Sequence, residues 1–323
     1  PLLLFSVFGS ALSLAIFASA QSVLILFAAR IIDGLTGGNF SVAQAVIADS
    51  TKEGSERTKS FGILGATFGF GFLIGPALGG LLSQITLTAP FWFAAGLSLL
   101  AVIFGLFFLP ETNTTKKIAK KEPLFRFNSL FSALSTPYVG VLLLITFLVN
   151  LASNSWIIGF QTFTVDVLKL NTTAIGLLFT VSGVIGIIMQ SFGLKYLLEK
   201  FKQRAKLLQL SLLLSGGVML LLSLAQNLPQ FLISIIVFGI VSAPLFPVIG
   251  SLITEHTKAE DQGGIMGINQ SYSSLGMIIG PLIAGFVAKY SVHTVFFITG
   301  LFILLSAGIT SRLQASRVKA IDL

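Results

Sequence analysis

The sequence has no cysteine, only two histidines and few charged residues. Charged side chains make up 10% of its 323 residues, whereas an ordinary soluble domain carries about 25%. Without cysteine there is no disulfide framework, thiolate metal site or thiol catalysis. His256 and His293 have no second strong ligand at metal-binding spacing. The sequence therefore predicts no metal site, no cofactor and no enzymatic chemistry.

Apolar surface is what the chain has in abundance. Hydrophobic residues make up 54% of it, 30 of them Phe, and its mean hydropathy is +0.94. A soluble fold of this composition would leave apolar faces in water, a difficulty that a lipid bilayer removes. The net charge is +8, but the basic residues lie between hydrophobic runs, which argues against nucleic acid as a partner. We expect an integral membrane protein.

Ten segments are apolar and long enough to cross a bilayer as helices, because a span needs about 20 apolar residues. They cover residues 1–20, 23–48, 61–83, 90–109, 137–163, 174–194, 207–225, 231–253, 264–288 and 292–311. The longest polar interruption separates four spans from six. We therefore predict an all-α polytopic membrane protein with an N-terminal helical half at 1–109, a cytoplasmic central loop at 110–136 and a C-terminal six-helix half at 137–323.

The distribution of Lys and Arg predicts the orientation, because short loops rich in these residues stay cytoplasmic. Seventeen basic residues lie in one set of alternating loops, and only Lys169 and Lys289 lie in the other set. The first set includes the central loop. We expect a multi-pass protein of the plasma (inner) membrane whose central loop and C-terminus are cytoplasmic.

The two halves repeat each other. Residues 47–80 align with residues 253–285, with Asp49 opposite Glu255. By this register the first half lacks roughly 70 residues, enough for two spans with their loops. The expected whole is a pair of pseudo-symmetric halves with twelve spans, of which this chain lacks the first two.

A charged pair inside the second segment is the sharpest candidate site. Arg30 and Asp33 are three residues apart and share one helix face, at a depth where a lone charge costs on the order of 3 kcal/mol. Small or polar residues continue this face at helical spacing: Gly34, Gly37, Ser41 and Gln44. The stripe predicts a substrate cavity with proton coupling at Arg30 and Asp33. A structural ion pair between helices is the alternative.

Glycines recur at every fourth position in the third segment. The array comprises Gly71, Gly75 and Gly79, with Pro76 and Gly80 beside them. Such small residues allow a neighbouring helix to approach closely, and proline bends the helix that contains it. The array therefore predicts close helix packing.

Other polar residues at helical spacing are candidates for the same cavity. They are Asn150, Asn154, Gln161, Asn269 and Ser273. Hydrogen bonding between helices explains them equally well. Trp92 and Trp156 are expected to be interface anchors or packing residues, and Pro244 with Pro247 predicts a broken helix within 231–253.

The stretch from Ala29 to Ser83 resembles the fourth and fifth spans of the major facilitator superfamily, especially drug/proton antiporters of the tetracycline-resistance efflux type. Arg30 and Gly34 match the family's Arg-x-x-x-Gly pattern, whose arginine is implicated in proton transfer. The glycine array matches its antiporter pattern, and Asp49 with Arg57 resembles the charges that help latch the cytoplasmic side. Asp33 departs from the family pattern, so its proposed role rests on its chemistry.

The resemblance implies a secondary transporter that exchanges a small amphipathic compound or drug for protons by alternating access. Its expected partners are that compound, protons and the lipid bilayer, and we expect a monomer. A metabolite facilitator or symporter of the same fold is the alternative, and a non-transporting membrane sensor is less favoured.

Overall fold

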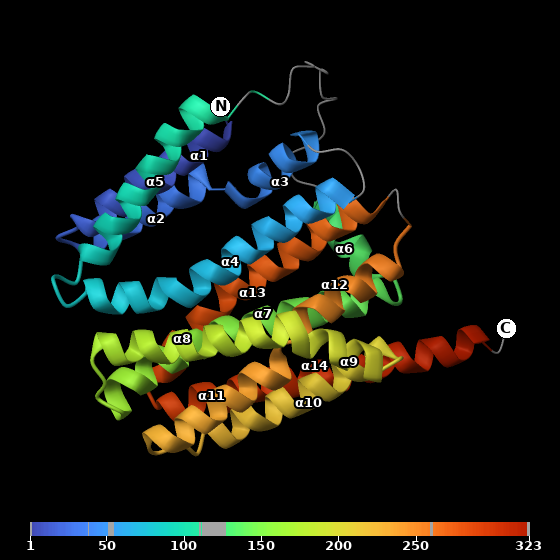
Figure 1. Cartoon of the computed structure of the whole chain (residues 1–323). Coiled ribbons are helices and arrows are strands. Elements are labelled where there is room, and N and C mark those ends of the chain that lie inside the picture. Colours follow the sequence, from blue (N-terminus) through green and yellow to red (C-terminus); the bar gives the residue numbers. More distant parts are fainter. Residues whose placement is uncertain are drawn as a thin grey trace. The chain divides into compact units, whose positions relative to one another are not determined.

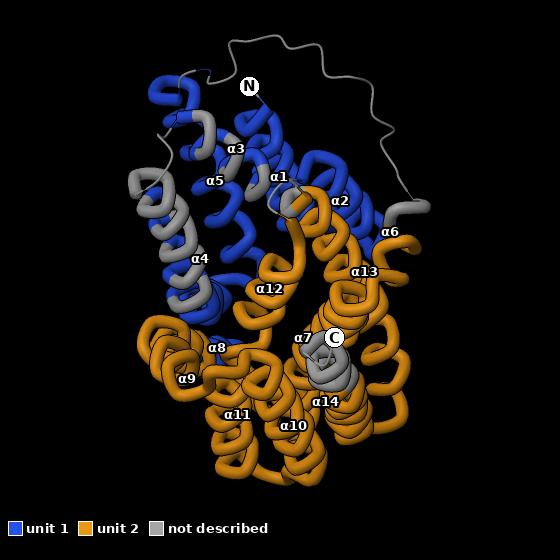
Figure 2. The backbone as a smooth tube through the Cα atoms, turned by 90° about the vertical axis from the view of Figure 1, so that its right-hand side faces the viewer, with its two compact units in different colours: residues 1–122, 172–180 blue, residues 123–171, 181–323 orange. Residues whose placement is uncertain are grey.

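The computed structural model describes residues 2–37, 39–50, 55–109, 111, 127–258 and 261–321 (Figure 1). All regular elements in these ranges are helical, as predicted. The chain forms two compact units, which Figure 2 distinguishes by colour. Unit 1 comprises residues 1–122 and 172–180, and unit 2 comprises residues 123–171 and 181–323.

Unit 1 is built from helices of the first third of the chain and the start of a later one. They are α1 (Leu2–Ala18), α2 (Val23–Thr36), α3 (Asn39–Ser50), α4 (Ser55–Leu82), α5 (Ala89–Phe108) and the first half of α8 (Thr172–Ile188). Unit 2 contains the rest of α8 and two π-helical turns, η1 and η2. Its other elements are α6 (Phe127–Leu134), α7 (Val139–Thr162), η1 (Phe163–Val167), η2 (Met189–Gly193), α9 (Leu194–Lys200), α10 (Arg204–Leu222), α11 (Leu228–Ser242), α12 (Leu245–Glu255), α13 (Gln262–Ala288) and α14 (Val292–Ile321).

Seven helical stretches of the described chain are long and apolar enough to cross a membrane. They are Ala89–Phe108, Val139–Val167, Thr172–Lys200, Arg204–Leu222, Leu228–Glu255, Gly264–Ala288 and Val292–Ser311. The apolar helix α1 is shorter, with 17 residues. A chain with this many apolar helices is suited to a bilayer. The total of ten spans and their grouping into two halves stay predictions.

The predicted helix over 23–48 is wrong at its centre. Helix α2 ends at Thr36 and α3 begins at Asn39, and Gly37 between them has an extended backbone, with ψ of 176°. Two consecutive glycines in the sequence favour this break, because each costs a helix about 1 kcal/mol relative to alanine. The face that carries Arg30 therefore does not continue to the residues of α3.

The predicted break within 231–253 is confirmed. Helix α11 ends at Ser242, and α12 begins at Leu245 with Pro244 at its N-cap. Proline supplies no backbone N–H and its ring clashes with the preceding turn, so it ends the helix before it.

The first turns of α8 belong to unit 1 because they pack tightly on the end of α4. A Cβ atom on Gly176 would lie 2.5 Å from the carbonyl oxygen of Pro76, a separation that admits no side chain. The Thr173 hydroxyl donates to the carbonyl of Gly80 over 3.2 Å, and the amide of Gln84 donates to the Thr173 hydroxyl over 2.9 Å. Gly176 thus permits α8 to approach α4 closely, and the hydrogen bonds of Thr173 and Gln84 hold the end of this contact.

Glycines also bring two helices of unit 2 together, α7 and α13. A Cβ atom on Gly276 would lie 2.6 Å from the carbonyl oxygen of Phe147, and one on Gly280 would lie 2.5 Å from that of Leu151. The Ser155 hydroxyl donates to the carbonyl of Gly280 over 3.0 Å. The two glycines thus let the backbones of α7 and α13 approach each other directly.

Candidate functional site

The structure brings the predicted charged pair together on α2. Arg30 Nη1 lies 3.7 Å from Asp33 Oδ2, and the two side chains are 53% and 37% exposed. The guanidinium carbon of Arg30 also lies 4.6 Å from the centre of the Phe17 ring on α1, a cation–π distance. Phe17 is in turn 4.6 Å, centre to centre, from Phe91 on α5. The cation is therefore shared between a carboxylate and an aromatic face.

Two polar side chains that sequence analysis missed complete the surroundings of Asp33. The Ser10 hydroxyl, on α1, donates to Asp33 Oδ1 over 3.1 Å. The amide of Asn39, at the start of α3, donates to the Ser10 hydroxyl over 3.2 Å. Arg30 and Ser10 thus contact different oxygens of one carboxylate, and Asn39 holds Ser10 from the far side of the helix break.

Other serines on the same face of α1 bond to α2 and to the start of α3. The Ser6 hydroxyl donates to the carbonyl of Thr36 over 2.6 Å and also bonds the side chain of Asn39. The buried Ser13 hydroxyl donates to the carbonyl of Ala29 over 2.9 Å. Ser6, Ser10 and Ser13 follow the i, i+4, i+7 spacing of one helix face, a signal that could have revealed them.

This arrangement presents one titratable group in an apolar surrounding. Arg30 and Asp33 are the only charged residues of α1, α2 and α5 within residues 2–18, 23–36 and 89–108. The carboxylate has a fixed cation on one oxygen and a neutral donor on the other.

Several predicted site residues have side chains outside the described part of the molecule. Ser41, Gln44 and Asp49 fall in α3, and Arg57 falls in the first turn of α4. The predicted gate formed by Asp49 and Arg57 therefore stays a prediction. Gly34 is an exposed residue of α2.

The glycine array of α4 divides into two parts. A Cβ atom on Gly71, Gly75 or Gly79 would meet no atom of the described chain within 4 Å. One on Gly80 would lie 3.2 Å from the carbonyl oxygen of Thr172. Within residues 55–82, Gly80 and the Pro76 carbonyl form the close contact with α8.

The predicted cavity amides of unit 2 bond within and between helices. The Thr146 hydroxyl donates to Asn269 Oδ1 over 2.7 Å. The buried amide of Asn150 donates to the Thr146 carbonyl, and that of Asn154 to the Asn150 carbonyl, each over 2.9 Å. Hydrogen bonding, the alternative open from the sequence, describes this α7–α13 contact. Gln161 is exposed and Ser273 half-buried, and a substrate role stays a prediction for the whole group.

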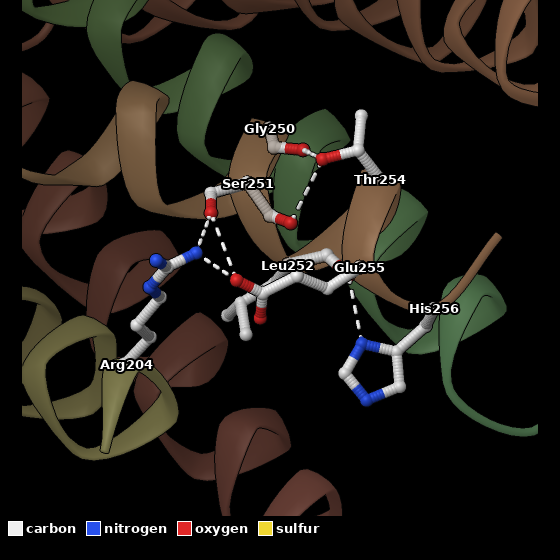
Figure 3. Close-up of polar contacts among 7 residues, drawn as sticks. All are labelled: Arg204, Gly250, Ser251, Leu252, Thr254, Glu255 and His256. Atoms are coloured by element: carbon white, nitrogen blue, oxygen red, sulfur yellow. Dashed lines mark hydrogen bonds and ion pairs between the residues drawn. The ribbon is translucent and has the colours of Figure 1, made fainter. Parts of the chain in front are cut away.

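A second ion pair, also missed from the sequence, lies in unit 2 (Figure 3). Arg204, the first residue of α10, donates from Nη1 to the Ser251 hydroxyl and to Glu255 Oε1 on α12. The Ser251 hydroxyl lies 3.3 Å from the same carboxylate oxygen. Glu255 is the residue that the internal repeat aligns with Asp49, and this alignment could have directed attention to it.

His256 follows this pair at the end of α12. Its Nδ1 lies 2.9 Å from the carbonyl oxygen of Leu252 (Figure 3), and its ring stacks on Tyr138 with 3.6 Å between centres. No group of three or more His, Cys, Asp or Glu residues that could hold a metal ion occurs in the described ranges.

The chain matches the Major Facilitator Superfamily over residues 1–204 and 142–318. It belongs to this superfamily. Its relatives include the class G tetracycline resistance protein of Vibrio anguillarum, which is 32% identical over 297 residues, covering 90% of this chain and 73% of the relative. The class E protein of Escherichia coli is 30% identical, with 89% and 71% covered. Quinolone resistance protein NorA of Staphylococcus aureus is 28% identical, with 86% and 70% covered.

Solved structures agree in fold. The human organic anion transporter MFSD10 matches with a TM-score of 0.70 at 22% identity, covering 95% of this chain and 76% of that one. A POT family transporter in complex with a thioalcohol-conjugated peptide matches with a TM-score of 0.78 at 12% identity, with 98% and 81% covered. The predicted resemblance to tetracycline-resistance proteins is confirmed, and this superfamily member is a multi-pass membrane transporter, not an enzyme.

Proposed function

We propose that this protein exports a small amphipathic drug-like compound from the cytoplasm in exchange for protons, by alternating access. The observation that carries the proposal is the carboxylate of Asp33, held between Arg30 and Ser10 in a helix without other charges. Ionisable residues inside membrane helices commonly mark ion or proton pathways. The names of the tetracycline and quinolone resistance relatives support a drug-like substrate.

In this proposal the charge state of Asp33 selects between two conformations. The ionised carboxylate attracts Arg30 over 3.7 Å. Protonation removes that attraction and leaves the guanidinium to the Phe17 ring, 4.6 Å away. A ligand or proton shifts a two-state equilibrium by its difference in affinity for the two states. The break between α2 and α3 adjoins the site and is a natural place for this change to occur.

The remaining sequence predictions belong to the same proposal. The chain represents part of two pseudo-symmetric halves that rock about a central cavity, with the central loop and the C-terminus cytoplasmic in an inner membrane. Asp49 and Arg57 close the cytoplasmic side, and Gly80 with the Pro76 carbonyl sets the contact of α4 with α8. The predicted polar residues of α2, α3, α7 and α13 contribute to the cavity wall.

A proton-release experiment in everted membrane vesicles tests this function. The vesicle lumen is acidified, a pH-sensitive dye reports the gradient, and tetracycline or norfloxacin is added. Wild type is expected to discharge the gradient, and Asp33→Asn to lose the response at least tenfold. Asp166→Asn is the matched control, because Asp166 is an exposed carboxylate in η1. Equal responses of wild type and Asp33→Asn would contradict the role of Asp33.

A facilitator or symporter of the same fold predicts a different outcome. Radiolabelled compound would then cross the vesicle membrane while the dye signal of the wild type stays constant, or the compound would move together with the proton. Either result would reject antiport. The comparison requires that each variant inserts normally into the membrane, which detergent extraction checks.

A further inference from the structure

Five groups from α1, α2 and α3 form a continuous series of hydrogen bonds in unit 1. The Ser10 hydroxyl donates to Asp33 Oδ1 over 3.1 Å and accepts from the Asn39 amide over 3.2 Å. The Asn39 oxygen in turn accepts from the Ser6 hydroxyl, which also lies 2.6 Å from the Thr36 carbonyl oxygen. We call these groups the Asn39 network. It joins the carboxylate of Asp33 to the last residue of α2.

Close packing of α1 on α2 holds the end of the Asn39 network in place. A Cβ atom on Gly9 would lie 2.2 Å from the Thr36 Cβ, so only glycine admits this approach. Ser6 is 3% exposed, which shields its hydroxyl from solvent. Its proton is therefore available to the Asn39 oxygen and to the Thr36 carbonyl.

The ionised form of the Asn39 network is one proton short. Its four links need four protons. A hydroxyl donates one proton, a carboxylate and a carbonyl donate none, and the Asn39 amide directs its N–H to one neighbour and its oxygen to the other. With Asp33 ionised, Ser10, Asn39 and Ser6 supply one proton each. The single Ser6 proton then has two acceptors.

Protonation of Asp33 supplies the missing proton at a defined atom. Arg30 Nη1 lies 3.7 Å from Asp33 Oδ2, and a guanidinium only donates hydrogen bonds. The added proton therefore belongs on Oδ1, the oxygen that faces Ser10. Oδ1 then donates to the Ser10 hydroxyl and no longer accepts from it.

This change reverses every other link of the Asn39 network. The Ser10 proton needs a new acceptor, so Asn39 has to present its oxygen to Ser10. Its N–H groups then face Ser6, and the Ser6 proton goes to the Thr36 carbonyl alone. All four links now have a proton of their own.

The reversal requires no space and no second titratable group. The nitrogen and oxygen of an amide are nearly equal in size and exchange places by a half-turn of the side chain. Apart from Asp33 itself, Arg30 is the only charged residue within the described ranges of α1, α2 and α5. On α3, Asp49 is at the opposite end from Asn39. Serine and asparagine do not titrate, so only Asp33 can change the number of protons in the network.

We propose that Asn39 is a positioning residue whose side-chain amide reverses when Asp33 gains a proton, and that this reversal transmits proton uptake to the end of α2. The reversal changes what the Thr36 carbonyl accepts, directly before the helix break at Gly37. The proposal rests on the transport function proposed above and assigns the contact through which Asp33 acts on the break.

Nuclear magnetic resonance of the purified full chain, with isotope-labelled asparagine and serine, tests the reversal. Asp33→Asn fixes the reversed state, because the Arg30 cation attracts the oxygen of the substituted amide and leaves its N–H for Ser10. The Asn39 N–H groups should show a nuclear Overhauser effect to Ser10 in wild type and to Ser6 in Asp33→Asn. The signals are identified by their loss in Asn39→Leu, Ser10→Ala and Ser6→Ala.

The vesicle assay tests whether Asn39 acts through Ser10. Asn39→Leu removes the donor and the acceptor at similar volume and should lower drug-driven proton release about fivefold. In the Ser10→Ala protein, Asn39→Leu should have no further effect, because the link to Asp33 is already cut. Ser13→Ala is the matched control, since this buried serine of α1 bonds the Ala29 carbonyl outside the network.

Two results would overturn the proposal. One is an Overhauser effect that stays with Ser10 in Asp33→Asn. The other is a pair of losses that multiply in the double variant of Ser10 and Asn39, which would mean that Asn39 only holds α3 in place. If the Overhauser effect changes partner but wild type releases no protons, the fault lies in the proposed antiport and the Asn39 network stands.

Discussion

The close contact between α7 and α13 can be tested with a single methyl group. A Cβ atom on Gly276 would lie 2.6 Å from the Phe147 carbonyl oxygen and 2.7 Å from the Leu151 amide nitrogen. Both are backbone atoms, so neither can rotate away. Gly276→Ala therefore forces the two helices apart.

The matched control is Gly285→Ala on the same helix. A Cβ atom there would meet nothing within 4 Å among the described residues. Both substitutions gain the same helix propensity, about 1 kcal/mol, so this contribution cancels between them. What remains is the overpacking at Gly276, typically about 1–3 kcal/mol. We expect Gly276→Ala to unfold more easily than Gly285→Ala by that free energy.

Thermal unfolding of the purified variants in detergent, followed by tryptophan fluorescence, measures the difference. For a chain of 323 residues, the unfolding entropy is about 0.7 kcal/mol/K, so a change of 1 kcal/mol shifts the Tm by about 1.5 °C. The two variants should therefore differ by about 1.5–4.5 °C. If Gly276→Ala melts at the same temperature as Gly285→Ala or above it, the backbones of α7 and α13 do not meet at this point and the packing argument is wrong.

Two further predictions concern the polar contacts. Ser10→Ala removes the hydroxyl that donates to Asp33 Oδ1, so drug-driven proton release in vesicles should fall several-fold. Ser13→Ala loses only a bond to the Ala29 carbonyl and should leave this release unchanged. A double-mutant cycle of Arg204→Ala and Glu255→Ala, measured by unfolding in detergent, should give a coupling free energy of about 1 kcal/mol or less. The reason is that both side chains are 42% exposed. A coupling of several kcal/mol would mean that the pair is shielded from solvent.

Local features of the chain were readable from the sequence because their physics is local. The hydrocarbon core of a bilayer offers the backbone no hydrogen-bond partners, and a helix satisfies its own backbone groups. A sufficiently long apolar run is therefore predicted to be a helix. Pro244 lacks a backbone N–H in any surroundings, which is why the break between α11 and α12 was predictable. The family pattern between Ala29 and Ser83 could be recognised for the same reason, because its residues lie close together along the chain.

The predicted helix over 23–48 was wrong because hydropathy alone does not decide where a helix ends. Continuous apolar character predicted one helix over 23–48, but hydropathy does not count the conformational freedom of Gly37 and its glycine neighbour, and the helix ends there. The rotation of α3 about its axis relative to α2 could therefore not be predicted from the sequence.

By itself, then, the sequence determined that this protein is an α-helical membrane transporter of a known superfamily and that Arg30 and Asp33 share one helix face. Only the tertiary structure decided which side chains meet across helices. Ser10 reaches Asp33 from α1, Arg204 reaches Glu255 from α10, and Trp156 is left with a buried donor beside Phe238. Periodicity defines the faces of each helix, but the rotation and crossing of one helix against another depend on the packing of the whole interface.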